Sequence, residues 1–430
     1  MANNFDSNFS RKLMDSFLQP FQSERVLTKN VNTQMFAGKF NGSTGDTIDV
    51  KRPTDFVTVR TATGDVSGAT ASSIITGKAT ATVQEYFTSF VDYDEADEAI
   101  KMGQLDQLLA PMATRMVTDF ELDYAGFMRK NTALLSGTVG TAISSWDHIA
   151  RFGATLDTSG VPKDSMWNAA INPFTQTALA SNTRSLGAGG SMGSVIKSAH
   201  EKGVITSDFA GMKVLAANTL SNHTTGVGAD RAGTVVGTPV ATYVSAKDTM
   251  TQVIGVTAFQ ANLVVAAGET VSITAASGAV NRLNLSTRQT IVDAAGAAIL
   301  WTGTVTTAVT LDGSGAGNLT VTGPAVFEAA GQYNTVSQAI AASDVITLAG
   351  AASTLIQPAL FWHKNAFTCA SVPIKKLHST DTVATTSDGL QFRVSKGSNF
   401  LENEQLVRID FRPAYGVLNP FFAGQGFGYA

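Results

Sequence analysis

The chain carries little charge for its length of 430 residues. Asp, Glu, Lys and Arg together make up 15% of the sequence, whereas about 25% is usual for a soluble domain. Hydrophobic residues make up 44%, which is enough for packed cores and excludes a globally disordered chain. Much of the surface must therefore consist of Thr, Ser, Asn and backbone, or it must be buried between chains. The second possibility predicts assembly.

Several features that indicate particular functions are also missing. The formal net charge of −4 argues against a general nucleic-acid-binding surface, which needs clustered Lys and Arg. No stretch approaches about 18 consecutive apolar residues, so we expect no membrane span. The first nine residues hold no basic region followed by an apolar run, so we expect no signal peptide. These features favour a soluble cytoplasmic protein.

Residues that bind metals or act as nucleophiles are sparse. The only cysteine, Cys369, excludes an internal disulfide, and its apolar neighbours predict a buried, inert thiol. No histidine lies within four residues of another, so we expect no zinc site or other metal site. The five histidines are His148, His200, His223, His363 and His378.

No motif predicts an enzyme or a cofactor site. The glycine-rich run at 187–193 precedes a helical pattern, but no strand precedes it, as a nucleotide-binding loop requires. The acidic run at 92–98 lacks the central Gly and terminal Glu of a calcium loop. No Ser/His/Asp or paired-carboxylate arrangement can be singled out. We therefore expect no catalytic residues and no cofactors, and interpret the protein as structural.

The low charge is concentrated in one stretch, from Ala232 to Leu360. Short alternating runs such as 269–273 and 318–322 predict strands there, and Thr and Val are abundant. The sequence on both sides is more charged and predicts helices. We interpret the stretch as a β-rich module inserted into a host domain that resumes near Phe361.

The N-terminal half of the host predicts an arm, a long hairpin and a long helix. Strand candidates at 47–50, 56–60, 79–83 and 86–91 flank a tip with several glycines. Such a hairpin buries little against its own chain, which favours contact with a neighbour. Apolar residues recur every three or four positions from Leu105 to Phe127, and predict a helix from Pro111 to Leu135 with Pro111 in its first turn or at a kink. The runs at 390–394 and 406–411 alternate again as strands.

The host portions resemble the major capsid proteins of short-tailed phages of enteric bacteria. Each matching string is short, but their order and spacing together are specific, over roughly 1–225 and 355–430. The strings are Thr44-Gly45-Asp46, Lys51-Arg52-Pro53, Thr61 to Gly68, Gly77 to Thr80, Glu98 to Lys101, Leu109 to Pro111, Val117 to Asp119, Lys376 to Ser379, Pro413 to Tyr415 and Asn419-Pro420.

The resemblance implies an α+β protein with the capsid fold of tailed phages and herpesviruses, interrupted by an inserted all-β domain. The expected parts are an N-terminal arm at 1–37, an extended loop at 38–91, a peripheral domain with a spine helix at 92–147, the first part of an axial domain at 148–226, an inserted β-barrel domain at 227–350, and the C-terminal part of the axial and peripheral domains at 351–430.

The expected function is self-assembly into the icosahedral head of a tailed phage, with the loop lying over an adjacent subunit. The expected contact residues of the loop are Lys51, Arg52, Phe56, Arg60, Ile74 and Ile75, and their acidic partners are Asp94, Glu95, Asp97 and Glu98. The expected partners are further copies of the chain in hexamers and pentamers, a scaffolding protein and a portal. Double-stranded DNA is enclosed without specific binding, no membrane is involved, and assembly takes place in the host cytoplasm.

Two other classes of protein stay open at the level of sequence. An encapsulin-like compartment would enclose a protein instead of a genome. A β-rich adhesin or tail-fibre protein would suit the Thr-, Gly- and Ala-rich middle of the chain. The adhesin hypothesis does not explain the long hairpin followed by a long helix.

Overall fold

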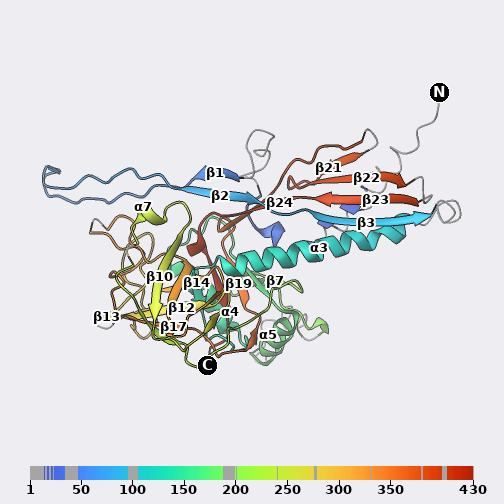
Figure 1. Cartoon of the computed structure of the whole chain (residues 1–430). Helices are drawn as coiled ribbons and strands as arrows, with labels where there is room; N and C mark the ends of the chain where they lie inside the picture. Colours follow the sequence, from blue (N-terminus) through green and yellow to red (C-terminus); the bar gives the residue numbers. More distant parts are fainter. Residues whose placement is uncertain are drawn as a thin grey trace. The chain divides into compact units, whose positions relative to one another are not determined.

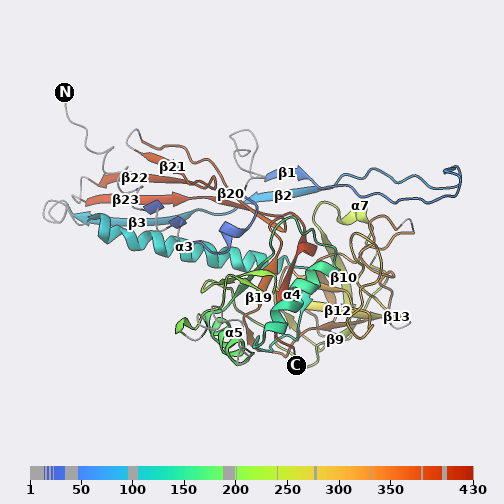
Figure 2. The same cartoon turned by 180° about the vertical axis from the view of Figure 1, so that it is seen from behind.

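The computed structural model describes residues 14, 17–18, 21–22, 24–33, 47–94, 105–186, 199, 201–239, 241–275, 278–329, 331–378, 381–399 and 404–429. The chain divides into two compact units, in line with its length. Unit 1 comprises Met1–Asp49, Thr80–Ala125 and Phe367–Val417, and unit 2 comprises Val50–Ala79, Gly126–Ala366 and Leu418–Ala430. Helices and several sheets are both present, so the predicted α+β class is confirmed (Figures 1 and 2).

Unit 1 contains a four-stranded antiparallel sheet in the order β21-β22-β23-β3. Its strands are β3 (Phe87–Asp94), β21 (Thr382–Thr385), β22 (Gln391–Asn399) and β23 (Glu404–Phe411). The predicted strands at 86–91, 390–394 and 406–411 are thereby confirmed. Phe392 lies opposite Phe411 in the register, and their rings stack with centroids 4.7 Å apart. These rings form part of an aromatic core.

A second sheet, most of whose residues belong to unit 1, has the order β1-β2-β24-β20. Its strands are β1 (Thr47–Lys51), β2 (Lys78–Val83), β20 (Phe367–Ser371) and β24 (Pro413–Val417). Cys369 of β20 is fully buried, and burial raises the pKa of its thiol. The predicted burial of Cys369 is therefore confirmed.

The long helix is α3 (Leu105–Lys130). Met116, Phe120 and Tyr124, each four residues from the next, are buried, which explains why the periodicity reveals the helix. Pro111 lies inside the helix and not in its first turn. The predicted end at Leu135 is wrong, because the side-chain amide of Asn131 donates to the carbonyl oxygen of Phe127 (2.8 Å) and the chain then turns into a strand.

Unit 2 contains a six-stranded mixed sheet in the order β4-β25-β19-β5-β7-β6. Phe152 stacks on Phe361 in its core (5.1 Å between centroids). The strands are β4 (Leu134–Ser136), β5 (Asn168–Ile171), β6 (Asp208–Phe209), β7 (Met212–Ala216), β19 (Ala359–Trp362) and β25 (Ala423–Gly426), and the helices are α4 (Trp146–Thr158) and α5 (Pro173–Leu186). The glycine run at 187–193 lies outside the described residues.

The charge-poor stretch of unit 2 forms a closed sheet, which we call the barrel. The strand order is β13-β12-β14-β16-β10-β9-β17, and pairing of β17 with β12 closes it. Alternating side chains such as Leu319 and Val321 point into a shared apolar core. The strands are β9 (Ala232–Val235), β10 (Thr251–Thr257), β12 (Thr270–Ala275), β13 (Gly278–Ala279), β14 (Thr302–Val305), β16 (Gly317–Thr322) and β17 (Val345–Leu348).

The remaining elements are short. They are η1 (Thr28–Asn30), η2 (Pro420–Phe422), α7 (Tyr243–Ala246), the pair β8 (His223–Thr224) with β18 (Leu355–Ile356), and the pair β11 (Val264–Val265) with β15 (Val309–Thr310). The predicted strand at 56–60 is wrong, since residues 52–77 belong to no strand. At the base of the loop the Arg52 amide donates to the carbonyl oxygen of Gly77 (2.8 Å), and farther out the Val57 amide donates to Ser72 Oγ (3.0 Å). A pair of arms without further strands gains little from a ladder.

Candidate assembly surface

Residues 52–77 form a long loop whose tip is exposed. Figures 1 and 2 show its two arms, in blue, running side by side beyond β1 and β2. Phe56 is 56% exposed and Ile74 is 75% exposed. Apolar side chains in such positions gain nothing from their own fold and are typical of a surface that another chain covers. We define the loop surface as the exposed residues Phe56, Val57, Val59, Arg60, Val66 and Ile74.

Arg52, predicted as a contact to another subunit, is buried within its own chain and only 7% exposed. Its Nε donates to the carbonyl oxygen of Lys78 (3.0 Å), and its terminal nitrogen donates to the carbonyl oxygen of Leu418. Burial lowers the pKa of Arg52 to about 10, although Tyr243 and Asp248 favour the charged form. This placement gives Arg52 a role inside its own subunit, so we remove it from the predicted contact set.

Ile75 also differs from the rest of the predicted set. It is half-buried and packs against a cluster that includes Tyr243 and Tyr333. Ile75 therefore contributes to the base of the loop within its own chain. Lys51 and Arg60 are exposed, as a contact to another subunit requires.

The acidic residues predicted to receive this loop can be placed only in part. Of the four predicted partners, Asp94 is the last residue of β3. Asp92, which begins the acidic run at 92–98, is exposed on the same strand. Glu95, Asp97 and Glu98 lie outside the described residues. Among the described strands, β3 lies at the edge of its sheet, because the sheet order places β23 beside it and ends there. Phe90, 69% exposed on β3, adds an apolar side chain near Asp92.

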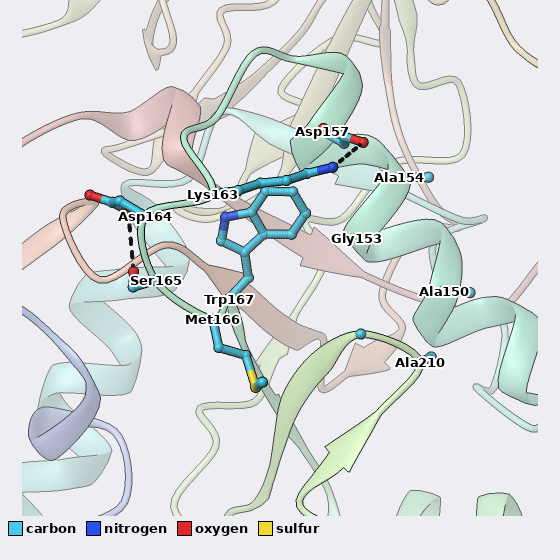
Figure 3. A pocket seen from close by; sticks show the side chains of 11 residues that line it. Ala150, Gly153, Ala154, Asp157, Lys163, Asp164, Ser165, Met166, Trp167 and Ala210 are labelled. Atoms are coloured by element: carbon cyan, nitrogen blue, oxygen red, sulfur yellow. Dashed lines mark hydrogen bonds and ion pairs between the residues drawn. The ribbon is translucent and has the colours of Figure 1, made fainter.

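Unit 2 also contains a hollow of about 580 Å³ that sequence analysis missed (Figure 3). Ala150, Gly153 and Ala154 of α4 form one wall. Lys163 crosses the ring of Trp167, with its ammonium nitrogen 5.6 Å from the ring centroid, and reaches Asp157 at 2.8 Å. The cation of the hollow is therefore already paired with a carboxylate.

Beside this hollow the structure brings together a Ser, a His and an Asp that spacing did not reveal. Asp164 Oδ1 lies 2.6 Å from His363 Nε2, and Ser165 Oγ lies 3.0 Å from the same nitrogen. The bond to His363 is the main reason that the pKa of Asp164 lies below its ordinary value. A triad needs the serine and the carboxylate on opposite ring nitrogens. Here His363 Nδ1 instead accepts from the Asn365 amide (3.2 Å), so the arrangement is a structural tie.

Two properties of the described part of the chain bear on other functions. None of its helices has both the length and the apolar character that crossing a membrane requires. Its His, Cys, Asp and Glu side chains form no group of three that could hold a metal ion.

Comparisons with known proteins agree over the full chain. A family model described as P22 coat protein, gene protein 5, matches residues 1–428. The major capsid protein of Acyrthosiphon pisum secondary endosymbiont phage 1 is 33% identical over 431 residues, covering 100% of both chains.

Solved structures with a similar arrangement are also phage proteins. The capsid of Ralstonia phage GP4 is 9% identical over 90% of this chain and 85% of its own, with a TM-score of 0.40. The Mycobacterium phage Che8 structure is 14% identical over 93% of this chain and 90% of its own, with a TM-score of 0.39. Scores this low add nothing to the match found by sequence.

Proposed function

The chain belongs to the P22 coat protein family and is a structural protein of a phage head; we propose that its copies close into an icosahedral shell, as hexamers and pentamers, around double-stranded DNA. The relative that is 33% identical along the whole chain is itself a major capsid protein, which supports this function. The family assignment also favours a phage shell over the encapsulin-like compartment and the adhesin that the sequence left open.

The observation that carries the proposal is the loop surface. Phe56 and Ile74 face solvent in the subunit, and covering an apolar side chain fully contributes about 1.5–3 kcal/mol. We propose that the loop lies over an adjacent subunit and covers these side chains there. Lys51 and Arg60 would set the register, since charge contributes more to orientation than to affinity. Asp92 and the acidic residues that follow it are the proposed partners.

The division of the chain is proposed with the same function. The barrel accounts for most of the proposed insert at 227–350, and the parts at 1–37, 38–91, 92–147, 148–226 and 351–430 form the host. The glycines at 64 and 68 are a proposed hinge of the loop, where open space surrounds both. One subunit must fit several environments in a shell, and such hinges allow it.

The partners other than the chain itself are proposed from the same function. Scaffolding protein and portal would act during assembly in the host cytoplasm, before DNA enters. The formal net charge of −4 supports enclosure of DNA without specific binding, because a strongly basic lining would hold the incoming phosphates.

Replacing Phe56 and Ile74 together by Ser tests the proposal. We expect folded subunits with unchanged thermal unfolding, and a critical concentration for assembly at least tenfold higher, because two apolar side chains no longer become covered. Electron microscopy shows whether closed particles form, and sedimentation of purified protein measures the concentration at which they form.

The matched control changes Val236 and Val253 to Ser, two exposed apolar residues on the outer face of the barrel. Normal assembly of the loop variant, or an equal loss in the control, contradicts the role of the loop surface. Failure of the unmodified protein to form particles under any condition contradicts the proposed function itself.

A further inference from the structure

We propose that the barrel region of each subunit fixes the direction of that subunit's loop. Arg288, Gln332 and Tyr333 are the positioning residues that hold the base of the loop. The contacts are seen within unit 2. The consequence for assembly rests on the proposed function, but the hold on the loop does not. We call this set of contacts the latch.

A single side chain holds both arms of the loop. The amide nitrogen of Gln332 donates to the carbonyl oxygen of Asp55 on the outgoing arm. The same nitrogen donates to the carbonyl oxygen of Ser73 on the returning arm (3.1 Å). Gln332 is 6% exposed, so water competes little for these bonds. Because both acceptors are backbone atoms, the latch fixes the arms themselves and not only their side chains.

Asp55 is held at two more points. Its carboxylate is paired with the Arg288 guanidinium, which also donates to the carbonyl oxygen of Asn334 (2.8 Å). Its amide donates to the hydroxyl oxygen of Tyr333 (3.4 Å). The Tyr333 ring is fixed in turn by stacking on Tyr243, with centroids 3.8 Å apart. Arg288, Gln332 and Tyr333 thus converge on Asp55 from two separate segments of the chain.

The returning arm is also held below Ser73. Lys78 donates its amide to Asp248 Oδ1 (3.1 Å), and the Lys247 ammonium contacts the same carboxylate at 3.0 Å. A Cβ on Gly77 would lie 2.6 Å from the carbonyl oxygen of Lys247. Only glycine allows the arm to lie this close to α7, so the approach is built into the sequence.

The latch depends on polar contacts more than on dense packing. A hollow of about 470 Å³ lies beside it, lined by Pro53, Thr54 and Asp55 of the loop together with Arg288 and Tyr333. Apolar packing on this side of the loop base is therefore incomplete. Loss of a few hydrogen bonds is then sufficient to free the direction of the loop while the barrel core stays intact.

Gln332→Glu tests the latch directly, because the side chain keeps its shape but sets a carboxylate against two carbonyl oxygens. Spin labels at Thr63→Cys in the loop and Val253→Cys on β10 report the distance distribution in unassembled subunits, while native Cys369 is buried. We expect a distribution at least twice as wide in the Glu variant. Gln260→Glu is the matched control, since this exposed side chain accepts from the Asp230 amide and a carboxylate can do the same.

A second variant covers the case in which Gln332→Glu does not fold. Asp55→Lys places a cation against Arg288 at a half-exposed position, and Arg288→Glu in the same chain restores a pair of opposite charge. We expect assembly about tenfold slower in the single variant and recovery in the double variant, at unchanged unfolding temperature.

Unchanged loop distributions in both latch variants overturn the inference. A wider distance distribution together with normal assembly supports the latch but contradicts the proposed contact of the loop with an adjacent subunit. A lowered unfolding temperature that tracks the slower assembly shows that these residues only stabilise the subunit, and also overturns it.

Discussion

The barrel and the loop surface contain the same kinds of apolar residue in opposite surroundings. In the barrel, Leu319 and Val321 are fully buried, because pairing of β17 with β12 closes the sheet around a shared core. In the loop, Phe56 and Val57 are exposed, because two arms have no second layer to cover them. Hydrophobicity alone therefore does not say which chain will cover a residue. Closure of the surrounding structure decides it.

Trp301→Ala in the barrel should produce the largest loss in the free energy of unfolding. This loss is the reference against which a loop variant is compared. Trp301 is 1% exposed in the barrel core, and its indole nitrogen donates to the carbonyl oxygen of Gly323 (2.9 Å). Truncation leaves a cavity and an unpaired carbonyl, so we expect a loss of about 3–5 kcal/mol in the free energy of unfolding. Val57→Ala in the loop should change it by less than about 0.5 kcal/mol. Denaturant titration of subunits measures both, and similar values for the two variants would break the comparison.

Glu269→Gln should come next, because it leaves a buried charge without its partner. Glu269 Oε2 lies 2.6 Å from an Arg231 nitrogen, and the two side chains are 0% and 6% exposed. Removing one charge of such a pair costs about 3 kcal/mol, whereas replacing both with apolar residues can be nearly neutral. We therefore expect Arg231→Met with Glu269→Leu to recover most of the loss. Equal instability of the single and the double variant, measured by denaturant unfolding, would show that the pair stabilises the barrel by itself.

Much of the fold could be predicted from the sequence because local patterns coincide with tertiary ones. The stripe through Met116, Phe120 and Tyr124 marks α3, and the alternation at 317–322 marks β16. The predicted helix end at Leu135 and the predicted strand at 56–60 are wrong for opposite reasons. Asn131 ends α3 by a side-chain bond that competes with the helix. The strand predicted at 56–60 has a suitable composition but no neighbouring strand with which to pair.

The site could be predicted only where exposure follows from position in the loop. Phe56 and Ile74 face solvent as expected, whereas Arg52 turns inward to carbonyl groups far along the chain, at Lys78 and Leu418. No pattern in the sequence predicts that these backbone carbonyl oxygens accept from Arg52. The latch was missed for the same reason, since Gln332 meets Asp55 across 277 positions. Polar residues inside a charge-poor stretch were the available signal, because they are kept there only where partners exist.

The smallest effect we predict concerns His223 of β8. Its two ring nitrogens are buried without a hydrogen-bond partner among the described residues. Burial, and then the Arg129 guanidinium of α3, lower its pKa from 6.5 to about 3. The unfolded chain therefore takes up a proton first as the pH falls. Stability is complete above pH 6.5 and is lost progressively between 6.5 and about 3.

Replacing His223 by Gln should remove part of this acid sensitivity. Between about pH 7 and pH 5 we expect the unmodified subunit to lose about 1 kcal/mol more than the Gln variant, after allowance for solvent at this half-buried ring. Denaturant titration at the two pH values measures the difference. Arg129→Gln is a partial control, because burial still lowers the pKa of His223 when the nearby cation is gone. If the free energy of unfolding changes equally with pH in the unmodified subunit and in the His223→Gln variant, His223 has the same pKa in the folded and the unfolded chain. The surroundings of His223 would then be as open to solvent as those of the exposed loop, and unlike the closed barrel core.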